Sequence, residues 1–233
     1  TAQNYIRFVT DPFYLEVLGT TIRVSVVVTA ACLVLGVPMA WRLARTQSRW
    51  KSAYVIAIVL PLFIGATTRI AGWMILFARG GMLDVASKLV GAPHPDLMFS
   101  ELAVVVGIVS INLPFTVLTL QSVFEGLDPR LEEAAASMGA PPARAFRRVV
   151  LPLAMPGVLI AAVLCFILAM NAFATPLLLG GPRFQMMAPL LYWEFATNNN
   201  WPFAGVLAFV LMASTLALTL AANALVPRRY RAA

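Results

Sequence analysis

Seven polar or aromatic residues lie in or beside long apolar stretches of the chain, where they could contact a solute. They are Arg69, Trp73, Asn112, Phe115, Asn171, Tyr192 and Trp193. A charged or amide side chain is costly to bury in a membrane, so such residues are candidates for lining a pathway. Aromatic faces attract cations. The chemistry that these residues predict is noncovalent contact with a solute.

Several of these positions have a second interpretation. Arg69 fits a buried pair or snorkelling to the membrane surface as well as it fits a pathway. For Arg23, nearer its helix end, snorkelling is favoured. Asn112 and Asn171 fit the commoner role of hydrogen-bonding a neighbouring helix, and Ser214 and Thr215 are expected to do the same.

Nothing in the sequence predicts a metal site. Cys32 and Cys165 fall within apolar segments and are expected to be small buried residues rather than a disulfide or metal ligands. The single histidine, His94, is expected in an exposed loop. No cofactor is expected in this chain.

Five apolar segments must position the candidate residues. Each is long enough to cross a bilayer core, which takes about 20 helical residues, and they span 18–40, 54–77, 102–124, 153–178 and 203–226. Hydrophobic residues make up 61% of the chain and charged residues 12%. The apolar runs are continuous rather than alternating, which favours helices over a barrel. We expect an all-α integral membrane protein with a single domain, 1–233.

The basic residues alternate between the connecting segments. The net charge is +7, and the basic clusters follow the first, third and fifth segments: Arg42, Arg45, Arg49 and Lys51; Arg130, Arg144, Arg147 and Arg148; Arg228, Arg229 and Arg231. By the positive-inside rule these loops and the C-terminus are cytoplasmic. The charge therefore indicates a membrane, not nucleic acid. A start outside the membrane without a signal peptide predicts one more span before Thr1.

A polar hairpin, residues 128–152, separates the third and fourth segments. Asp128 is expected to cap its first helix, with Pro129 as the first helical residue. An apolar stripe then follows helical spacing, Leu131, Ala134, Ala135 and Met138, flanked by Glu132 and Glu133. Gly139 is expected to stop the helix. Pro141 and Pro142 begin a second helix that carries Arg144, Arg147 and Arg148 and is expected to end at Pro152.

The spacing within this hairpin resembles the EAA loop of ABC importer permeases. Glu133-Ala134-Ala135 is followed after three residues by Gly139, and after nine more by Val149-x-Leu151-Pro152, with Val149 in place of isoleucine. The resemblance implies docking onto an ATPase subunit by Glu132, Glu133, Ala134, Ala135, Met138, Gly139 and Arg144. The alternative is a plain connector with a solvated basic face.

Other segments resemble spermidine/putrescine-type permeases almost end to end. They include Asp11-Pro12, 32–41, Leu60-Pro61-Leu62-Phe63, Gly180-Gly181 and 200–205. The resemblance implies the MetI-like type I ABC importer permease fold, a bacterial inner-membrane location, two cytoplasmic ATPase subunits, a second permease that is a paralogue, and a periplasmic binding protein. ATP and Mg²⁺ are expected on the ATPase, because this chain lacks a phosphate loop.

The cargo and the mode of transport have alternatives. A polyamine is the first candidate, and another small solute such as an amino-acid derivative or aminophosphonate is the second. All ten acidic residues fall in loops or at segment ends, so a cation is expected to meet aromatic faces such as Trp73, Phe115, Tyr192 and Trp193. A stand-alone secondary transporter would need midplane carboxylates or an inverted repeat, and neither is found. A third alternative is a non-transport membrane scaffold, but such a protein would have no use for the EAA-like hairpin.

Overall fold

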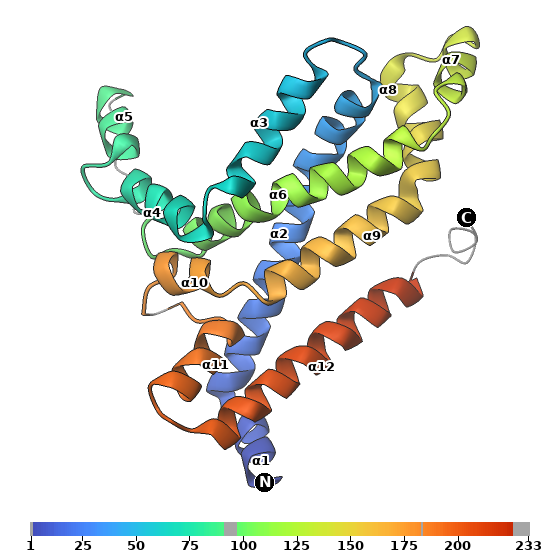
Figure 1. Cartoon of the computed structure of the whole chain (residues 1–233). Coiled ribbons are helices and arrows are strands. Elements are labelled where there is room, and N and C mark those ends of the chain that lie inside the picture. Colours follow the sequence, from blue (N-terminus) through green and yellow to red (C-terminus); the bar gives the residue numbers. More distant parts are fainter. Residues whose placement is uncertain (1, 91–96, 183, 226–233) are drawn as a thin grey trace.

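The computed structural model describes residues 2–90, 97–182 and 184–225, and every regular element in these ranges is helical (Figure 1). His94, Arg183, Arg228, Arg229 and Arg231 lie outside the described residues. The elements are α1 (Ala2–Thr10), α2 (Pro12–Arg45), α3 (Lys51–Phe63), α4 (Ala66–Phe77), α5 (Met82–Val90), α6 (Glu101–Glu125), α7 (Arg130–Ser137), α8 (Pro142–Ala145), the π-helical η1 (Phe146–Val150), α9 (Leu151–Met170), α10 (Ala174–Leu179), α11 (Met187–Ala196) and α12 (Trp201–Leu225).

Four helical stretches in the described residues are long and apolar enough to cross a membrane. They are Pro12–Arg45, Glu101–Glu125, Pro142–Met170 and Trp201–Ala222. The pair α3 and α4 counts as a fifth if the bent pair forms one span. Four to five apolar spans agree with the all-α membrane protein expected from the sequence.

The core of the bundle is the packing of α2 against α6 and α9. Gly36 of α2 lies so close to α6 that an added Cβ would stand 3.3 Å from the Thr116 methyl carbon. Asn112 of α6 donates from Nδ2 to the carbonyl oxygen of Cys165 on α9 at 3.4 Å. Small residues and interhelical hydrogen bonds are what brings helices together in a membrane, where the hydrophobic effect is absent.

The second expected span, 54–77, is not a straight helix. α3 meets the stretch Ala66–Val85, which holds α4 and the start of α5, at an angle of 93° across Ile64 and Gly65. Both residues have extended backbone angles, with ψ of 121° at Ile64 and 142° at Gly65. Extended residues end the run of i to i−4 hydrogen bonds, and Pro61 has already removed one donor within α3. Hydropathy could not reveal the bend, because both halves are apolar.

The expected boundaries of the fourth segment were also wrong. Pro152 does not end the return helix of the hairpin, because α8, η1 and α9 form one helical stretch, Pro142–Met170. Pro152 is the second residue of α9 and directly follows the π-helical turn, and a local π-helical adjustment is one way in which a membrane helix accommodates a proline. The helix then stops at Met170 rather than continuing to Leu178. Residues 171–173 interrupt it before α10 begins.

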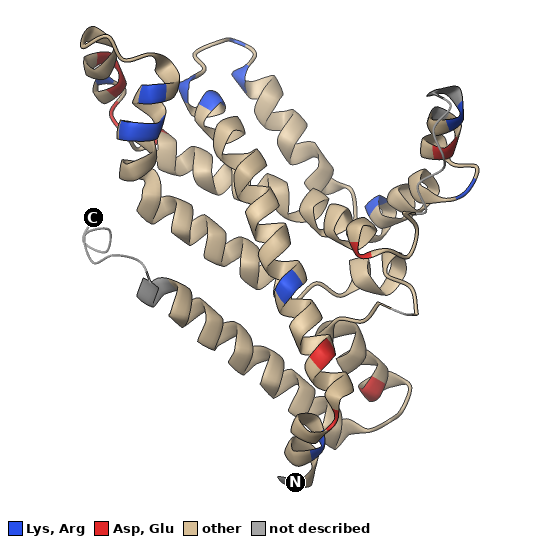
Figure 2. Ribbon diagram, turned by 180° about the vertical axis from the view of Figure 1, so that it is seen from behind, with Lys and Arg blue, Asp and Glu red and all other residues tan. Residues whose placement is uncertain are grey.

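Many charged residues lie toward the two ends of the bundle, and others lie on the arm formed by α4 and α5 (Figure 2). At one end, which we call the hairpin end, lie Arg45, Lys51 and α7; α1, α11 and the start of α12 lie at the far end. The expected short helix at 186–196 is α11, with Met187 and Leu190 buried and Tyr192 and Trp193 about half exposed.

Candidate functional site: the polar hairpin and the membrane-embedded polar residues

The first helix of the hairpin, α7, presents a largely open apolar face. Met138 is 83% exposed and Leu131 43%, and Ala134 is exposed as well, whereas Ala135 is buried against the chain itself. The Asp128 carboxylate accepts a hydrogen bond from the Arg130 amide at 2.9 Å, which fixes the start of the helix. Exposed apolar side chains on a short helix at the edge of the bundle are available to a partner surface.

The two adjacent acids of α7 have different surroundings. Glu132 accepts from Nε of Arg45 at 2.6 Å, and Arg45 also donates from Nη1 to the carbonyl of Leu127 at 3.1 Å. Both side chains of this ion pair are only about one-fifth exposed. Glu133 is exposed, and the structure gives its carboxylate no ion pair within the described residues. Glu132 therefore ties the hairpin to α2, while Glu133 is free to meet another molecule.

Gly139 makes the turn between the two limbs of the hairpin. Its φ is +80°, in the left-handed region where residues with a Cβ are strained. The amide of Ala140 donates to the Ala135 carbonyl at 3.0 Å and the Gly139 amide to that of Ala136 at 2.9 Å. This is the pattern that satisfies the last carbonyls of a helix ending in glycine. The stop expected from the sequence is confirmed.

The return limb is anchored to the bundle through Phe146. Its ring lies 4.6 Å from that of Trp41 on α2 and 6.2 Å from that of Phe124 on α6, measured between centroids. Sequence reasoning missed Phe146, Trp41 and Arg45 as parts of this site. The sequence does show an aromatic or basic residue near the hairpin-side end of each segment. It does not show which of these side chains contact one another. Arg144, Arg147 and Arg148 remain exposed.

Arg69 and Trp73 contact the same residue on the neighbouring span. Arg69 donates from Nη1 to the Ser110 carbonyl oxygen at 3.4 Å, and Trp73 donates from Nε1 to the Ser110 hydroxyl at 3.0 Å. The Arg69 side chain is half-buried, and its Nε is buried without a hydrogen-bond partner. The Arg69 guanidinium group therefore keeps one buried N–H donor, at Nε, without a hydrogen-bond partner.

Asn112 and Phe115 have unlike positions on α6. Asn112 is 3% exposed and bonded to α9, which is the helix-bridging role. Phe115 is 42% exposed.

Arg23, for which snorkelling was favoured, pairs with Glu101 at the bundle surface. Cys32 and Cys165 are buried free thiols, as expected.

The remaining three candidates lie near the far end of the bundle. Asn171 lines a cavity of about 450 Å³ between α9, α11 and α12, and its side chain also donates to the Ile167 carbonyl. The Tyr192 ring lies 5.0 Å from that of Phe173, and Trp193 is 54% exposed. In the described part of the chain, no hydrogen bond or ring contact joins this group to Arg69 or Trp73. The structure therefore does not gather all seven candidates at one place.

Comparison with known proteins identifies the family to which this helical bundle is similar. Residues 24–231 match the protein family described as "Binding-protein-dependent transport system inner membrane component". The chain is 32% identical over 235 residues to the spermidine/putrescine transport system permease protein PotB of Haemophilus influenzae, covering 98% of this chain and 82% of that protein. It is 33% identical over 213 residues to PotB of Escherichia coli, covering 91% and 77%.

The fold is also similar to a solved structure. A chain from the crystal structure of a bacterial alginate ABC transporter, in complex with an alginate-bound periplasmic protein, superposes with a TM-score of 0.81. The match covers 97% of this chain and 82% of that chain at 16% sequence identity, so it shows the fold alone. The predicted importer-permease bundle is confirmed.

Proposed function

This chain belongs to the family of inner-membrane components of binding-protein-dependent transport systems, and on that premise we propose that its cargo is a polyamine of the spermidine and putrescine class. The chain is an importer permease subunit and not an enzyme. The observation that carries the polyamine proposal is similarity at 32 and 33% identity, over nearly the whole chain, to two permeases named for these solutes. Another small solute is the second candidate.

An importer permease of this family works with an ATPase and a substrate-binding protein. For this chain we propose two ATPase subunits, which hold the ATP and Mg²⁺, and a second permease that is a paralogue. The sequence supports a separate ATPase, because its only lysines, Lys51 and Lys88, do not follow a glycine as a phosphate loop requires. Native mass spectrometry of the purified complex tests the composition, and two identical permease chains would contradict the paralogue.

The hairpin is proposed to transmit ATPase movement to the spans. Glu133, Ala134 and Met138 form the contact, since they are exposed on α7. Movement of α7 passes to α2 through the ion pair between Glu132 and Arg45, and to α2 and α6 through the ring of Phe146. Because η1 continues directly into α9, the same movement also tilts that span.

The docking proposal is tested with Glu133→Lys in the assembled importer. Reversing an exposed charge at the contact should uncouple ATP hydrolysis from uptake without unfolding the permease, because Glu133 has no ion pair within the described residues. Glu16→Lys is the matched control, an exposed acid of α2 on the far end. Uptake and coupled ATPase activity that equal the wild type in both variants would show that α7 does not dock.

The cargo is tested on the binding protein that co-purifies with the complex. Mass spectrometry of its bound solute should find spermidine or putrescine, and proteoliposomes loaded with ATP should accumulate labelled spermidine. A sugar or an amino acid on the binding protein would exclude a polyamine and leave the importer function intact.

The route of a polyamine through this chain is proposed to use aromatic faces. Among the described acids, Asp84 on α5 and Glu194 on α11 are 5% and 8% exposed, more buried than a loop position suggests. Trp73, Phe115, Tyr192 and Trp193 are partly or half exposed and offer cation–π contacts. Tyr192→Leu should lower spermidine uptake, whereas Tyr192→Phe should retain it.

A further inference from the structure

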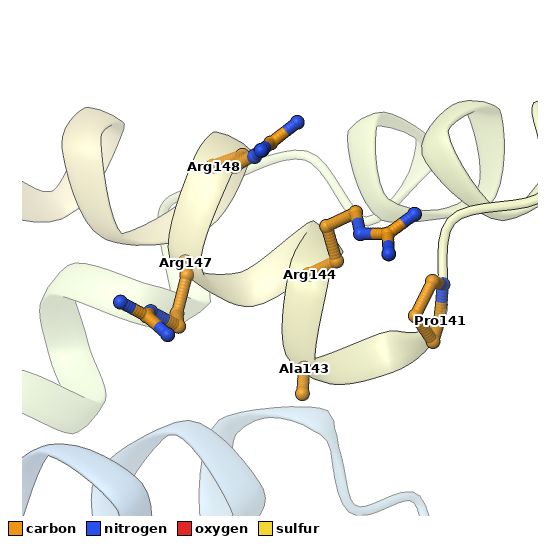
Figure 3. A pocket seen from close by; sticks show the side chains of 5 residues that line it. All are labelled: Pro141, Ala143, Arg144, Arg147 and Arg148. Atoms are coloured by element: carbon orange, nitrogen blue, oxygen red, sulfur yellow. The ribbon is translucent and has the colours of Figure 1, made fainter.

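Three arginines on the return limb of the hairpin surround one concave surface. Arg144, Arg147 and Arg148, with Pro141 and Ala143, line a cavity of about 440 Å³ that opens to solvent (Figure 3). We call it the arginine pocket. α8 and η1 place the three arginines within five consecutive residues, 144–148, so their positive charge is concentrated over a short distance.

The arginine pocket has no neutralising group of its own. Within the described residues, no carboxylate lies within 4 Å of these three side chains, and no hydrogen bond is formed by them. The neighbouring basic residues differ, since Arg45 pairs with Glu132 and Lys51 with Glu125. Glu132 of the hairpin is thus already engaged by Arg45. Three exposed arginines around a cavity without a counter-ion are suited to an anionic ligand.

The depth of the pocket matches a lipid headgroup. Arg148 and Arg147 precede Leu151, the first residue of α9, by three and four residues, or roughly 4.5 and 6 Å along a helix. The headgroup layer is about 5–7 Å thick on each side of the hydrocarbon core. Arg144 stands about 10 Å from Leu151, beyond that layer on its aqueous side. Beyond Leu151, the apolar residues Leu153, Met155 and Ile160 are exposed.

We propose that the arginine pocket binds the phosphate of an anionic phospholipid in the adjoining leaflet, with the acyl chains along the exposed apolar side of α9. A guanidinium group offers paired donors that match phosphate oxygens. Exposed apolar residues on α9, which continues directly from η1, favour a lipid over a soluble anion. An acidic surface of the ATPase is the rival ligand, but the open apolar face suited to a protein lies on α7, not on η1.

The proposal is tested on the complete importer in nanodiscs made from equal parts of phosphatidylglycerol and phosphatidylcholine. Native mass spectrometry should find phosphatidylglycerol retained preferentially by the wild type. In Arg147→Gln/Arg148→Gln the preference should fall about 25-fold, because each basic residue near an anionic surface contributes about a factor of five. Arg42→Gln/Arg49→Gln removes two exposed cations of the same end that are likewise unpaired in the described residues but do not line the pocket, so its preference should fall less than that of Arg147→Gln/Arg148→Gln.

Further arms separate the rival ligands. Arg147→Lys/Arg148→Lys keeps both charges but not the forked donors, so its loss should be smaller than that of the Gln variant. Equal retention of phosphatidylglycerol in the wild type, the Lys variant and the Gln variant would contradict a lipid site at the arginine pocket. Phosphatidylglycerol that is held by the permease alone and released by the ATPase would assign the arginines to the protein interface. Displacement by excess inorganic phosphate would assign them to a small anion.

Discussion

Neighbouring residues of α7 have separate tasks because a helix turns by about 100° per residue. Glu132 points back to Arg45 of α2, and Glu133 points outward. The resemblance to the EAA loop grouped both acids as docking residues, whereas their surroundings separate an anchoring residue from an exposed one. Both roles in coupling remain predictions. The same distinction applies to Ala135, which is buried, and Ala134, which is exposed.

A double-mutant cycle of Arg45→Gln and Glu132→Gln tests the anchoring. Because both side chains are only about one-fifth exposed, we expect a coupling energy of about 1 kcal/mol, between the values for exposed and buried pairs. Thermal unfolding of the purified permease measures it, and hydrogen exchange across 128–140 should increase in either single variant. Glu133→Gln is the control and should change neither. Strictly additive effects would mean that the ion pair does not hold the hairpin.

Gly139→Ala should strain the turn of the hairpin. Nothing stands within 4 Å of an added Cβ, so the cost comes only from the φ of +80° and should be about 1–2 kcal/mol. Gly126→Ala is the matched control, since Gly126 has a φ of −72° and ordinary space for a Cβ. The unfolding midpoint and the coupled ATPase activity should both fall in Gly139→Ala alone. An unchanged midpoint would rule out the strained turn.

At the scale of the elements, α6 and α9 approach more closely than ordinary side chains permit. A Cβ added at Gly157 of α9 would overlap both methyl groups of Val123 on α6. The helices are broken elsewhere, at Ile64–Gly65 and at 171–173, so rigid packed segments alternate with bends. Under the coupling proposal, hairpin movement would tilt whole segments instead of bending them.

Gly157→Ala should therefore destabilise the contact between α6 and α9. Overpacking a close helix contact costs about 1–3 kcal/mol, and Val123→Ala in the same chain should restore much of it by removing the methyl groups. Gly19→Ala is the control, because nothing lies within 4 Å of its added Cβ. Unfolding midpoints of the three variants measure the effect. Failure of Val123→Ala to rescue would place the strain elsewhere.

For the whole molecule, the distribution of charge sets the orientation in the membrane. The hairpin end carries Arg42, Arg49, Lys51 and the arginine pocket, and cytoplasmic loops are rich in such residues. We therefore propose that the hairpin end faces the cytoplasm and the far end the periplasm.

Single-cysteine labelling tests this orientation. Ser137→Cys on α7 and Asn199→Cys before α12 introduce exposed thiols at opposite ends, while the native Cys32 and Cys165 are buried. A membrane-impermeant maleimide should reach Asn199→Cys in cells with only the outer membrane permeabilised. It should reach Ser137→Cys only after the inner membrane is opened. The reverse pattern would invert the proposed topology.

The sequence by itself determined the features that depend on local order along the chain. Apolar runs predicted the spans, the spacing from Glu133 to Pro152 predicted the family, and Gly139 predicted its turn, because hydropathy, motif spacing and backbone preference are properties of consecutive residues. The bend at Ile64–Gly65 and the helix that runs through Pro152 were not predicted, because tertiary packing decides between the backbone geometries that a glycine or proline permits.

Only the tertiary structure decided which distant residues meet. Arg45 and Glu132 are 87 residues apart, and Asn112 and Cys165 are 53 apart. Local periodicity has no information at such separations. The packing of α2, α6 and α9 decides these residue pairs, because it determines which side of each helix is buried against which neighbour. The division of the hairpin into an acid paired with α2, an open apolar face and an unneutralised arginine pocket is therefore a consequence of the bundle, not of the motif.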